Sequence, residues 1–387
     1  MSFSFVSFRF FPFYLLVFCL LLFKMTLNPA QGLTSPQMSS DSLMRISKTK
    51  PMVLFHCPEF SDLAAEIVKR DPETFLLGKI TWDKFEDGFP NFTIHRWSTD
   101  LRNRHVVFLA SFLLEKAATS IFDQISVIWS FPRSSAKSLT VILPYFPTGT
   151  MERVESEGQI ATAKTMARLL STTPFCRGSG PAQVAIMDIH ALQERFYFAD
   201  TVLPIFLTAI PMFIEAIQDI DLEGPVAIAF PDDGARKRFG KQFKELASSK
   251  KNVMPGDEPC EIIVCTKVRE GNKRVVKIHE GDAQGKHVFI VDDLIKTGGT
   301  ILQCKKVLEE AGAAAVGAFA THGVFPEESW RKFQNAGFSH VFLTNSCPQI
   351  AKEVEGKEPF KVLSIADALL DFLKNESSTK FFCTERK

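Results

Sequence analysis

Two adjacent carboxylates, Asp292 and Asp293, follow an apolar run at residues 288–291 that is expected to form a buried strand. A short segment of small, hydroxylated and glycine residues comes next, at 296–300, and a helix is expected at 301–311. The backbone N–H groups of such a loop, together with the positive end of the helix dipole, can bind a phosphate group. Carboxylates at the carboxyl edge of a strand can accept hydroxyl groups or bind Mg²⁺. The pattern therefore predicts a site for a phosphorylated sugar.

An ordinary surface turn with an acidic helix cap would explain the two carboxylates taken alone. It would not explain why Gly298 and Gly299 follow them before Thr300. Consecutive glycines cost conformational entropy and are unnecessary in a simple turn. We therefore favour the sugar-phosphate interpretation for the segment as a whole.

A second acidic turn, at residues 230–235, places Asp232 between an expected strand at 225–230 and an expected helix at 233–247. Taken alone, this turn is most simply the capped start of a helix. If both acidic turns belong to one sheet, however, Asp232 becomes a second wall of the same site.

Cations and a histidine complete the set of candidate residues. Lys267 and Arg269 lie two positions apart on an expected strand, so both can point to one face and meet one phosphate group. A solvated basic hairpin is the simpler interpretation of that pair. His190 ends an expected strand at 184–189; a histidine there is more often structural, although ligand contacts collect at this edge of α/β sheets.

Expected strands and helices alternate from residue 51 to residue 373, which indicates an α/β fold with mostly parallel sheets wound on both faces. The pattern divides into two similar arrays, one at 50–200 and one at 201–373, followed by a tail at 374–387. The boundary is expected near Asp200, and a helix interrupted by Pro211 is expected at 205–220. A further helix is expected at 326–335.

Residues 1–49 form a leader that is set apart by its composition. Its apolar stretch at 8–23 is rich in phenylalanine and closes at Lys24, and no acidic residue precedes Asp41. Three interpretations stay open: a signal peptide, an organelle transit peptide, or translation that starts at Met25.

Composition excludes some classes of protein. The chain has 387 residues, 45% of them hydrophobic, and a formal net charge of +1, which argues against a dedicated nucleic-acid-binding protein. The eight cysteines form no Cys-x-x-Cys pair, so the sequence indicates neither a zinc site nor a disulfide framework. The sequence also lacks the glycine-lysine signature of a Walker-type nucleotide site.

Together these motifs resemble those of the ribose-phosphate pyrophosphokinases, the phosphoribosyl pyrophosphate synthetases, and in detail the plant-type second class of that family. The resemblance covers residues 50–373. The matching segments are Phe-Pro-Thr-Gly-Thr at 146–150, Asp-Ile-His-Ala-Leu-Gln-Glu-Arg-Phe at 188–196, Phe-Pro-Asp-Asp-Gly-Ala at 230–235, Thr-Lys-Val-Arg at 266–269, and the loop at 296–300.

The resemblance implies two phosphoribosyltransferase-like, Rossmann-like domains, an active site where they meet, and assembly into homo-oligomers. It implies transfer of the pyrophosphoryl group of ATP to the anomeric hydroxyl of ribose 5-phosphate with Mg²⁺, in support of nucleotide synthesis. The predicted compartment is the cytoplasm, or a mitochondrion or plastid if the leader is a transit peptide.

The resemblance also implies a role for each matching residue. Lys267 and Arg269 are expected to stabilise the transferring group, and His190 and Asp232 to contact the metal. The ribose phosphate is expected to be held by Asp232, Asp292, Asp293, Thr297, Gly298, Gly299 and Thr300. Phe85 and Asp87 match positions at which a neighbouring subunit binds adenine.

The sequence departs from the family pattern at several positions. Residues 146–153 lack the Arg-Gln-Asp signature of the commoner class, which leaves the ATP contacts there open. This change is usual in the second class, and the resemblance to that class implies that phosphate is not needed for activation and that donors besides ATP are accepted. Lys296 stands where an acidic, polar or small residue is expected, and Arg236 replaces an aromatic residue.

Two rival functions are weighed against the synthetase. A phosphoribosyltransferase would use the same sugar-phosphate loop, but the doubled domain and the pair Lys267 and Arg269 argue against it. A non-catalytic subunit that only binds active synthetases would be indicated by loss of Lys267, Arg269 or His190, and all three are present.

Overall fold

The structure is a computed structural model that describes residues 50–112, 117–220, 222, 224–247, 260–270 and 273–374. Side chains are described throughout these ranges except at 117–119, 245–247, 267–270 and 273–275. The expectations for the leader at 1–49 and for most of the tail therefore lie outside the described residues. Among the helices of the described ranges, none is both long and apolar enough to span a membrane.

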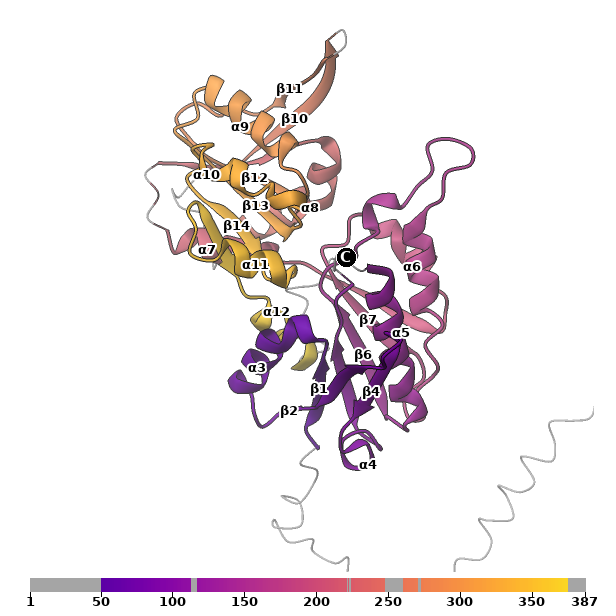
Figure 1. The fold of residues 1–387 in the computed structure, drawn as a ribbon. Helices are drawn as coiled ribbons and strands as arrows, with labels where there is room; N and C mark the ends of the chain where they lie inside the picture. Colours follow the sequence, from indigo (N-terminus) through magenta and orange to yellow (C-terminus); the bar gives the residue numbers. More distant parts are fainter. Residues whose placement is uncertain are drawn as a thin grey trace, which may run out of the picture. The chain divides into compact units, whose positions relative to one another are not determined.

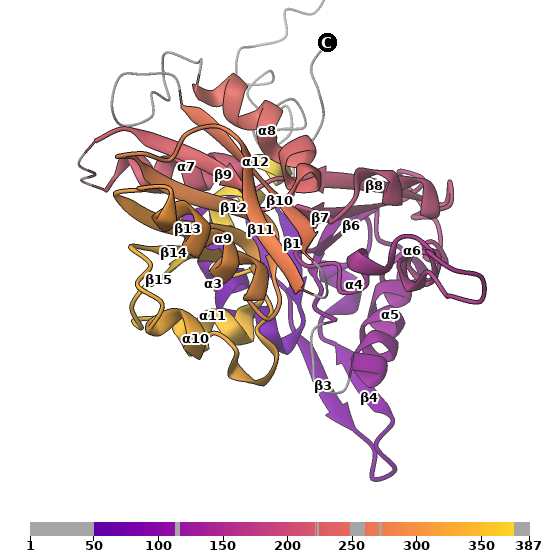
Figure 2. The same ribbon diagram turned by 90° about the horizontal axis from the view of Figure 1, so that it is seen from above.

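The first sheet has six parallel strands in the order β2-β1-β5-β6-β7-β8. Its strands are β1 (Met52–His56), β2 (Phe75–Leu77), β5 (His105–Leu109), β6 (Ser138–Leu143), β7 (Ala182–Met187) and β8 (Val202–Leu207). A separate antiparallel hairpin is formed by β3 (Ile80–Lys84) and β4 (Pro90–Ile94), and Figure 2 shows it projecting from the rest of the first half.

The second sheet has seven strands in the order β11-β10-β9-β12-β13-β14-β15, and β11 alone runs antiparallel to its neighbour. Its strands are β9 (Val226–Phe230), β10 (Glu261–Glu270), β11 (Lys273–Glu280), β12 (His287–Ile295), β13 (Ala315–Gly323), β14 (Val341–Thr344) and β15 (Phe360–Leu363). These two mostly parallel sheets confirm the predicted α/β fold class.

Helices cover both faces of each sheet, and Figure 1 shows α3 and α5 on opposite sides of the first one. The helices of the first half are η1 (Pro58–Phe60), α3 (Ser61–Arg70), α4 (Trp97–Asp100), α5 (Ala117–Arg133), η2 (Gly149–Met151), α6 (Thr162–Leu170) and η3 (Leu192–Tyr197). Those that follow are α7 (Ile210–Gln218), α8 (Asp233–Ala247), α9 (Gly299–Glu310), η4 (Pro326–Glu328), α10 (Arg331–Gln334), α11 (Pro348–Val354) and α12 (Ala366–Lys374).

Strand β12 shows why a continuous apolar run forms a central strand. Successive side chains of a strand point to opposite faces. Phe289 therefore packs with Phe213 of α7 at a ring distance of 5.6 Å, whereas Val288 and Ile290 belong to a second apolar cluster with Ile301 of α9. Because both faces are covered by helices, an uninterrupted apolar sequence is favourable here.

The division between the two halves differs from the expected boundary near Asp200. Residues 202–207 form β8, the last strand of the first sheet, and only 210–218 of the expected helix at 205–220 is helical. Helix α12, at the end of the second array, packs against α3 of the first half, and one apolar cluster includes both. The ion pair between Lys374 and Asp71, at 2.6 Å, lies at the same junction.

Two further elements differ from expectation. Strand β12 continues through Ile295, so Asp292 and Asp293 lie within it rather than after it. The neighbouring strand β13 continues through Gly323 and pairs with Asp292, Leu294 and Ile295, so the two strands stay joined on both sides of Asp293. The expected helix at 326–335 is two short helices, η4 and α10, because the backbone at Glu327 has a φ of 54° and is not helical.

Candidate functional site

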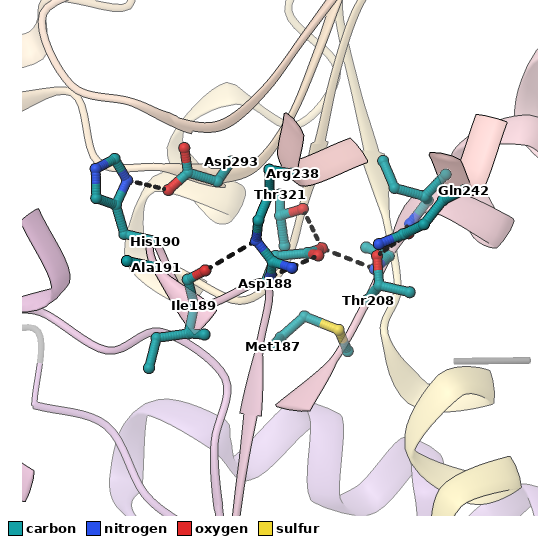
Figure 3. Close-up of polar contacts among 12 residues, drawn as sticks. Met187, Asp188, Ile189, His190, Ala191, Thr208, Arg238, Gln242, Asp293 and Thr321 are labelled. Atoms are coloured by element: carbon teal, nitrogen blue, oxygen red, sulfur yellow. Dashed lines mark hydrogen bonds and ion pairs between the residues drawn. The ribbon is translucent and has the colours of Figure 1, made fainter. Parts of the chain in front are cut away.

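The residues after β7 meet the middle of β12 (Figure 3). His190 Nδ1 lies 2.8 Å from Asp293 Oδ2, a contact between residues 103 positions apart in the sequence. The His190 side chain is 41% exposed, whereas that of Asp293 is 10% exposed. The histidine therefore joins the first half to the second at a place that solvent can reach.

A cavity of about 780 Å³ opens beside this contact. Its lining includes His190, Asp232, Asp292 and Asp293, so it brings together four of the residues predicted from sequence. The lining also includes Arg153, from the segment 146–153 at which ATP contacts were left open, and Arg238 and Lys237, which were not predicted. A cavity lined by both carboxylates and cations is suited to a phosphorylated sugar together with a polyphosphate.

The electrostatics of the acidic pair reflect its burial. Burial and the neighbouring charge of Asp293 raise the pKa of Asp292 well above its ordinary value. Burial also acts to raise the pKa of Asp293, but its hydrogen bond with His190 and the charge of that ring outweigh burial and lower it. The same hydrogen bond raises the pKa of His190. The pKa values of the two neighbouring carboxyl groups are thus shifted in opposite directions.

Asp232 is fixed by the helix that it precedes. Its Oδ1 accepts a hydrogen bond from the backbone N–H of Ala235 at 3.0 Å, which caps the start of α8. Arg236, which departs from the family pattern, pairs with Asp233 at 3.1 Å on the outer turn of that helix. The acidic turn therefore caps a helix and lines the cavity, so the two interpretations of this turn are compatible.

The predicted phosphate loop lies at the N-terminus of α9. Gly298 has a φ of 78° and precedes the first helical residue, Gly299, while Thr297 and Lys296 are exposed. Unpaired N–H groups at such a helix start are donors for an anion. The residues 297–300 follow directly from the strand that carries the acidic pair, but they are not part of the cavity lining described above.

Gly298 also supports a test of loop geometry. A Cβ at this position would overlap the ring of Phe333, and the left-handed backbone would be strained as well. We expect Gly298→Ala to lower the free energy of unfolding by about 2–4 kcal/mol, measured by urea denaturation. Gly299→Ala is the matched control, because the nearest atom to its Cβ would be Thr297 Oγ1 at 4.0 Å and its φ is not positive. Equal losses in both variants would contradict this account of the loop.

Other predicted residues lie elsewhere or cannot be placed. Phe85 and Asp87 belong to the turn of the β3–β4 hairpin; Phe85 is 55% exposed, and neither residue lines the cavity. The backbones of Lys267 and Arg269 lie in β10, opposite Val276 and Arg274 of β11. Their side chains lie outside the described residues, so their predicted convergence on a phosphate remains a prediction.

Sequence reasoning missed three buried charged residues around the site, Asp188, Glu194 and Arg238. Asp188 is fully buried, and Glu194 is 1% exposed, with a pKa raised by burial to about 8. Arg238 approaches Asp188 at 3.8 Å. The only sequence signal for the two carboxylates was their place in the segment 188–196, in which His190 alone was predicted as a site residue.

Both halves match known families. Residues 52–173 match the N-terminal domain of ribose phosphate pyrophosphokinase, and residues 260–382 match the phosphoribosyl synthetase-associated domain. An Arabidopsis thaliana protein named ribose-phosphate pyrophosphokinase 4 is 44% identical over 356 residues, which cover 90% of this chain and 100% of the relative. The chain belongs to the ribose-phosphate pyrophosphokinase family.

Relatives in this family carry names from different compartments. Ribose-phosphate pyrophosphokinase 3, chloroplastic, of Oryza sativa subsp. japonica is 46% identical over 84% of this chain and 76% of its own length. A mitochondrial family member of Spinacia oleracea is 43% identical over 89% of this chain and 82% of its own length.

The fold agrees with the family. The crystal structure of phosphoribosylpyrophosphate synthetase from Mycobacterium smegmatis aligns with a TM-score of 0.69 at 23% identity. The alignment covers 84% of this chain and 98% of that protein.

Proposed function

We propose that this chain is an active ribose-phosphate diphosphokinase, which converts ATP and ribose 5-phosphate to phosphoribosyl pyrophosphate and AMP. Membership of the family across both halves of the chain is the observation that carries the proposal. It is supported by the cavity that gathers His190, Asp232, Asp292 and Asp293 from both halves. The geometry gives no separate support for a non-catalytic subunit or a phosphoribosyltransferase.

The acceptor sugar would be held by the second half. Asp292 and Asp293 would accept hydrogen bonds from ribose hydroxyls, and Asp232 would face them from the start of α8. The backbone N–H groups of residues 297–300 would bind the 5-phosphate at the N-terminus of α9. Lys296 is exposed next to this loop, and a cation there would add to the attraction for the 5-phosphate.

The reaction forms one bond and breaks another at the β-phosphorus of ATP. The anomeric oxygen of ribose 5-phosphate attacks that phosphorus and loses its proton, while the bond from the phosphorus to the oxygen that bridges the α- and β-phosphates breaks and AMP leaves. Negative charge spreads over the transferring oxygens in such a step. Lys267 and Arg269 would stabilise that charge from β10, and His190 would contact a phosphate or the metal.

Mg²⁺ is the metal that the family implies, and the donor set fits a metal that arrives with substrate. Within the described ranges, no group of three or more His, Cys, Asp or Glu side chains is arranged to hold a metal ion on its own. Mg²⁺ usually binds one or two carboxylates and completes its shell with water and substrate phosphates. Asp232 and Asp292 could supply those carboxylates, and a nearby cation would oppose the burial and the charge of Asp293 that together raise the pKa of Asp292. When bound, the ion would neutralise phosphate charge.

We infer that adenine binding involves a second copy of the chain. Phe85 and Asp87 lie on the β3–β4 hairpin and do not line the cavity. Within one chain, therefore, they are not part of the site that contains the acidic pair. In a homo-oligomer, the exposed Phe85 ring of one subunit could stack on a purine bound by its neighbour. This arrangement would place the active site near a subunit interface.

A coupled assay for AMP tests the proposed function. We expect purified protein to form AMP from ATP only when ribose 5-phosphate and Mg²⁺ are both present. Running the assay with and without inorganic phosphate tests the class, because second-class enzymes need no phosphate for activation. Protein that binds both substrates but forms no AMP would contradict the proposal.

A further inference from the structure

Four consecutive residues at the end of β7, 187–190, each make a polar contact with the second half of the chain. His322 Nε2 lies 3.1 Å from the Met187 carbonyl oxygen. Thr321 Oγ1 donates to Asp188 Oδ2 at 2.6 Å (Figure 3). Arg238 Nε donates to the Ile189 carbonyl oxygen at 3.2 Å, and His190 contacts Asp293. We call residues 187–190 the hinge strip.

Asp188 is the strained residue of the hinge strip. It has a φ of 34°, which is unusual for a residue with a side chain, and it is fully buried. Its Oδ2 accepts from the Ala209 N–H at 2.8 Å as well as from Thr321. A buried carboxylate in an unfavourable backbone conformation persists only where its surroundings fix it, so these two donors determine the direction in which the chain leaves β7.

His322 contacts Met187, the residue that precedes Asp188 in the hinge strip. It is 2% exposed, and burial lowers its pKa, which favours the neutral ring. The ring makes two contacts: Nε2 lies 3.1 Å from the Met187 carbonyl oxygen, and Nδ1 lies 2.8 Å from the Ser346 hydroxyl, which itself donates to the Thr321 carbonyl oxygen at 2.9 Å. Thr321 and His322 are neighbours on β13, and neither lines the cavity.

We propose that Thr321 and His322 are positioning residues, which hold the hinge strip against β13 so that His190 meets Asp293 at the cavity. Neither side chain needs to touch a substrate to do this. The inference rests on the proposed function, because its consequence is the placement of His190 during pyrophosphoryl transfer. A displacement of about 1 Å in a reacting group can cost about 100-fold in rate, so a hydrogen bond that fixes the strip can affect turnover.

Thr321→Val is the central variant, since it removes the hydroxyl and keeps the shape of the side chain. We expect kcat to fall by about tenfold while KM for ATP changes by less than about twofold. A tenfold loss is smaller than the loss of about 100-fold in rate that a displacement of about 1 Å can cause. Thr321→Ser, which restores the hydroxyl, is expected to recover at least half of the wild-type kcat.

Thr173→Val is the matched control for the loss of a buried threonine hydroxyl. Thr173 is 2% exposed and Thr321 0%, but the Thr173 hydroxyl donates to the Leu170 carbonyl oxygen at 2.7 Å within the first half. We expect this variant to lower the thermal unfolding midpoint and to leave kcat unchanged. The comparison separates a general loss of stability from loss of positioning.

A double-mutant cycle with His190→Ala decides whether the effect passes through His190. If Thr321 acts by placing that ring, Thr321→Val lowers kcat by less than about twofold in the His190→Ala background. Wild-type kcat in folded Thr321→Val, or the same tenfold loss in both backgrounds, would overturn the inference.

Ser346→Ala decides the question if Thr321→Val does not fold. It removes the hydroxyl that contacts both His322 Nδ1 and the Thr321 carbonyl oxygen, and it changes the volume of the side chain very little. We expect a loss of about threefold in kcat, and an unchanged kcat would overturn the inference. Wild-type protein is assayed first: if it forms no AMP, the proposed function fails, whereas active wild type with fully active variants removes only the positioning role.

Discussion

Asp293→Asn is expected to lower kcat/KM for ribose 5-phosphate by at least about 100-fold, measured by the coupled AMP assay. Each hydrogen bond to a charged group contributes about 1.5–3 kcal/mol, and the variant removes the charge that would accept ribose hydroxyls. It also weakens the contact with His190 at 2.8 Å, which the ionised carboxylate now stabilises. Both losses act on the same step, so the effect should exceed that of a single contact.

The control for Asp293→Asn is the same substitution on an exposed helix. Asp62 forms an ion pair with Lys352 at 2.6 Å and does not line the cavity. Asp62→Asn is expected to keep wild-type kcat/KM, because exposed ion pairs contribute little to stability. If Asp293→Asn kept kcat/KM within about threefold of wild type, Asp293 would have no direct role in binding the acceptor.

Local chemistry made much of the fold predictable from sequence. The helix at 233–247 was predicted with its observed bounds, because Asp232 supplies a side-chain cap and the helical run continues to Ala247. The local sequence also accounts for strand β1, since a short apolar run between Pro51 and Cys57 is typical of a buried strand. Signals of this kind depend on residues close together in the chain.

The strand β8 was missed because its sequence is ambiguous. The residues 202–207, Val-Leu-Pro-Ile-Phe-Leu, are uniformly apolar, and the same pattern fits a buried helix that continues into 210–218. Pairing with β7, which only the tertiary structure provides, decides in favour of a strand. The error moved the expected boundary between the halves to a point before the last strand of the first sheet.

The candidate site was predictable residue by residue but not as a set of contacts. Asp232, Asp292, Asp293 and His190 could be singled out by their places at strand ends and in turns. The meeting of His190 with Asp293 could not, because it joins residues 103 positions apart in different halves. Asp188 lies in a matching motif, but the sequence predicts no role for it, since nothing local reveals that Thr321 donates to it. Buried polar contacts of this kind follow from the packing of the two halves.

Lys267→Ala is expected to lower kcat by at least about 100-fold, the scale of one contact to a transition-state charge. The backbone of Lys267 lies in β10, two residues before Arg269 and directly after Thr266, where β10 and β11 extend as a hairpin (Figure 1). A cation that acts only on the transferring pyrophosphoryl group stabilises the transition state more than the bound substrates. The loss should therefore appear in kcat, with a smaller change in KM for ATP.

Lys277→Ala is the matched control, because Lys277 lies on β11 of the same hairpin and is exposed. In the strand register Lys277 pairs with Thr266, whereas Lys267 pairs with Val276, so the two lysines occupy alternate faces of the hairpin. If the lysines only attract ATP by their general positive charge, either substitution should weaken that attraction about equally. The loss would then appear as a higher KM for ATP at low salt in both variants. A large loss of kcat in Lys267→Ala alone would assign the charge to the reaction itself, and an unchanged kcat would remove Lys267 from the site.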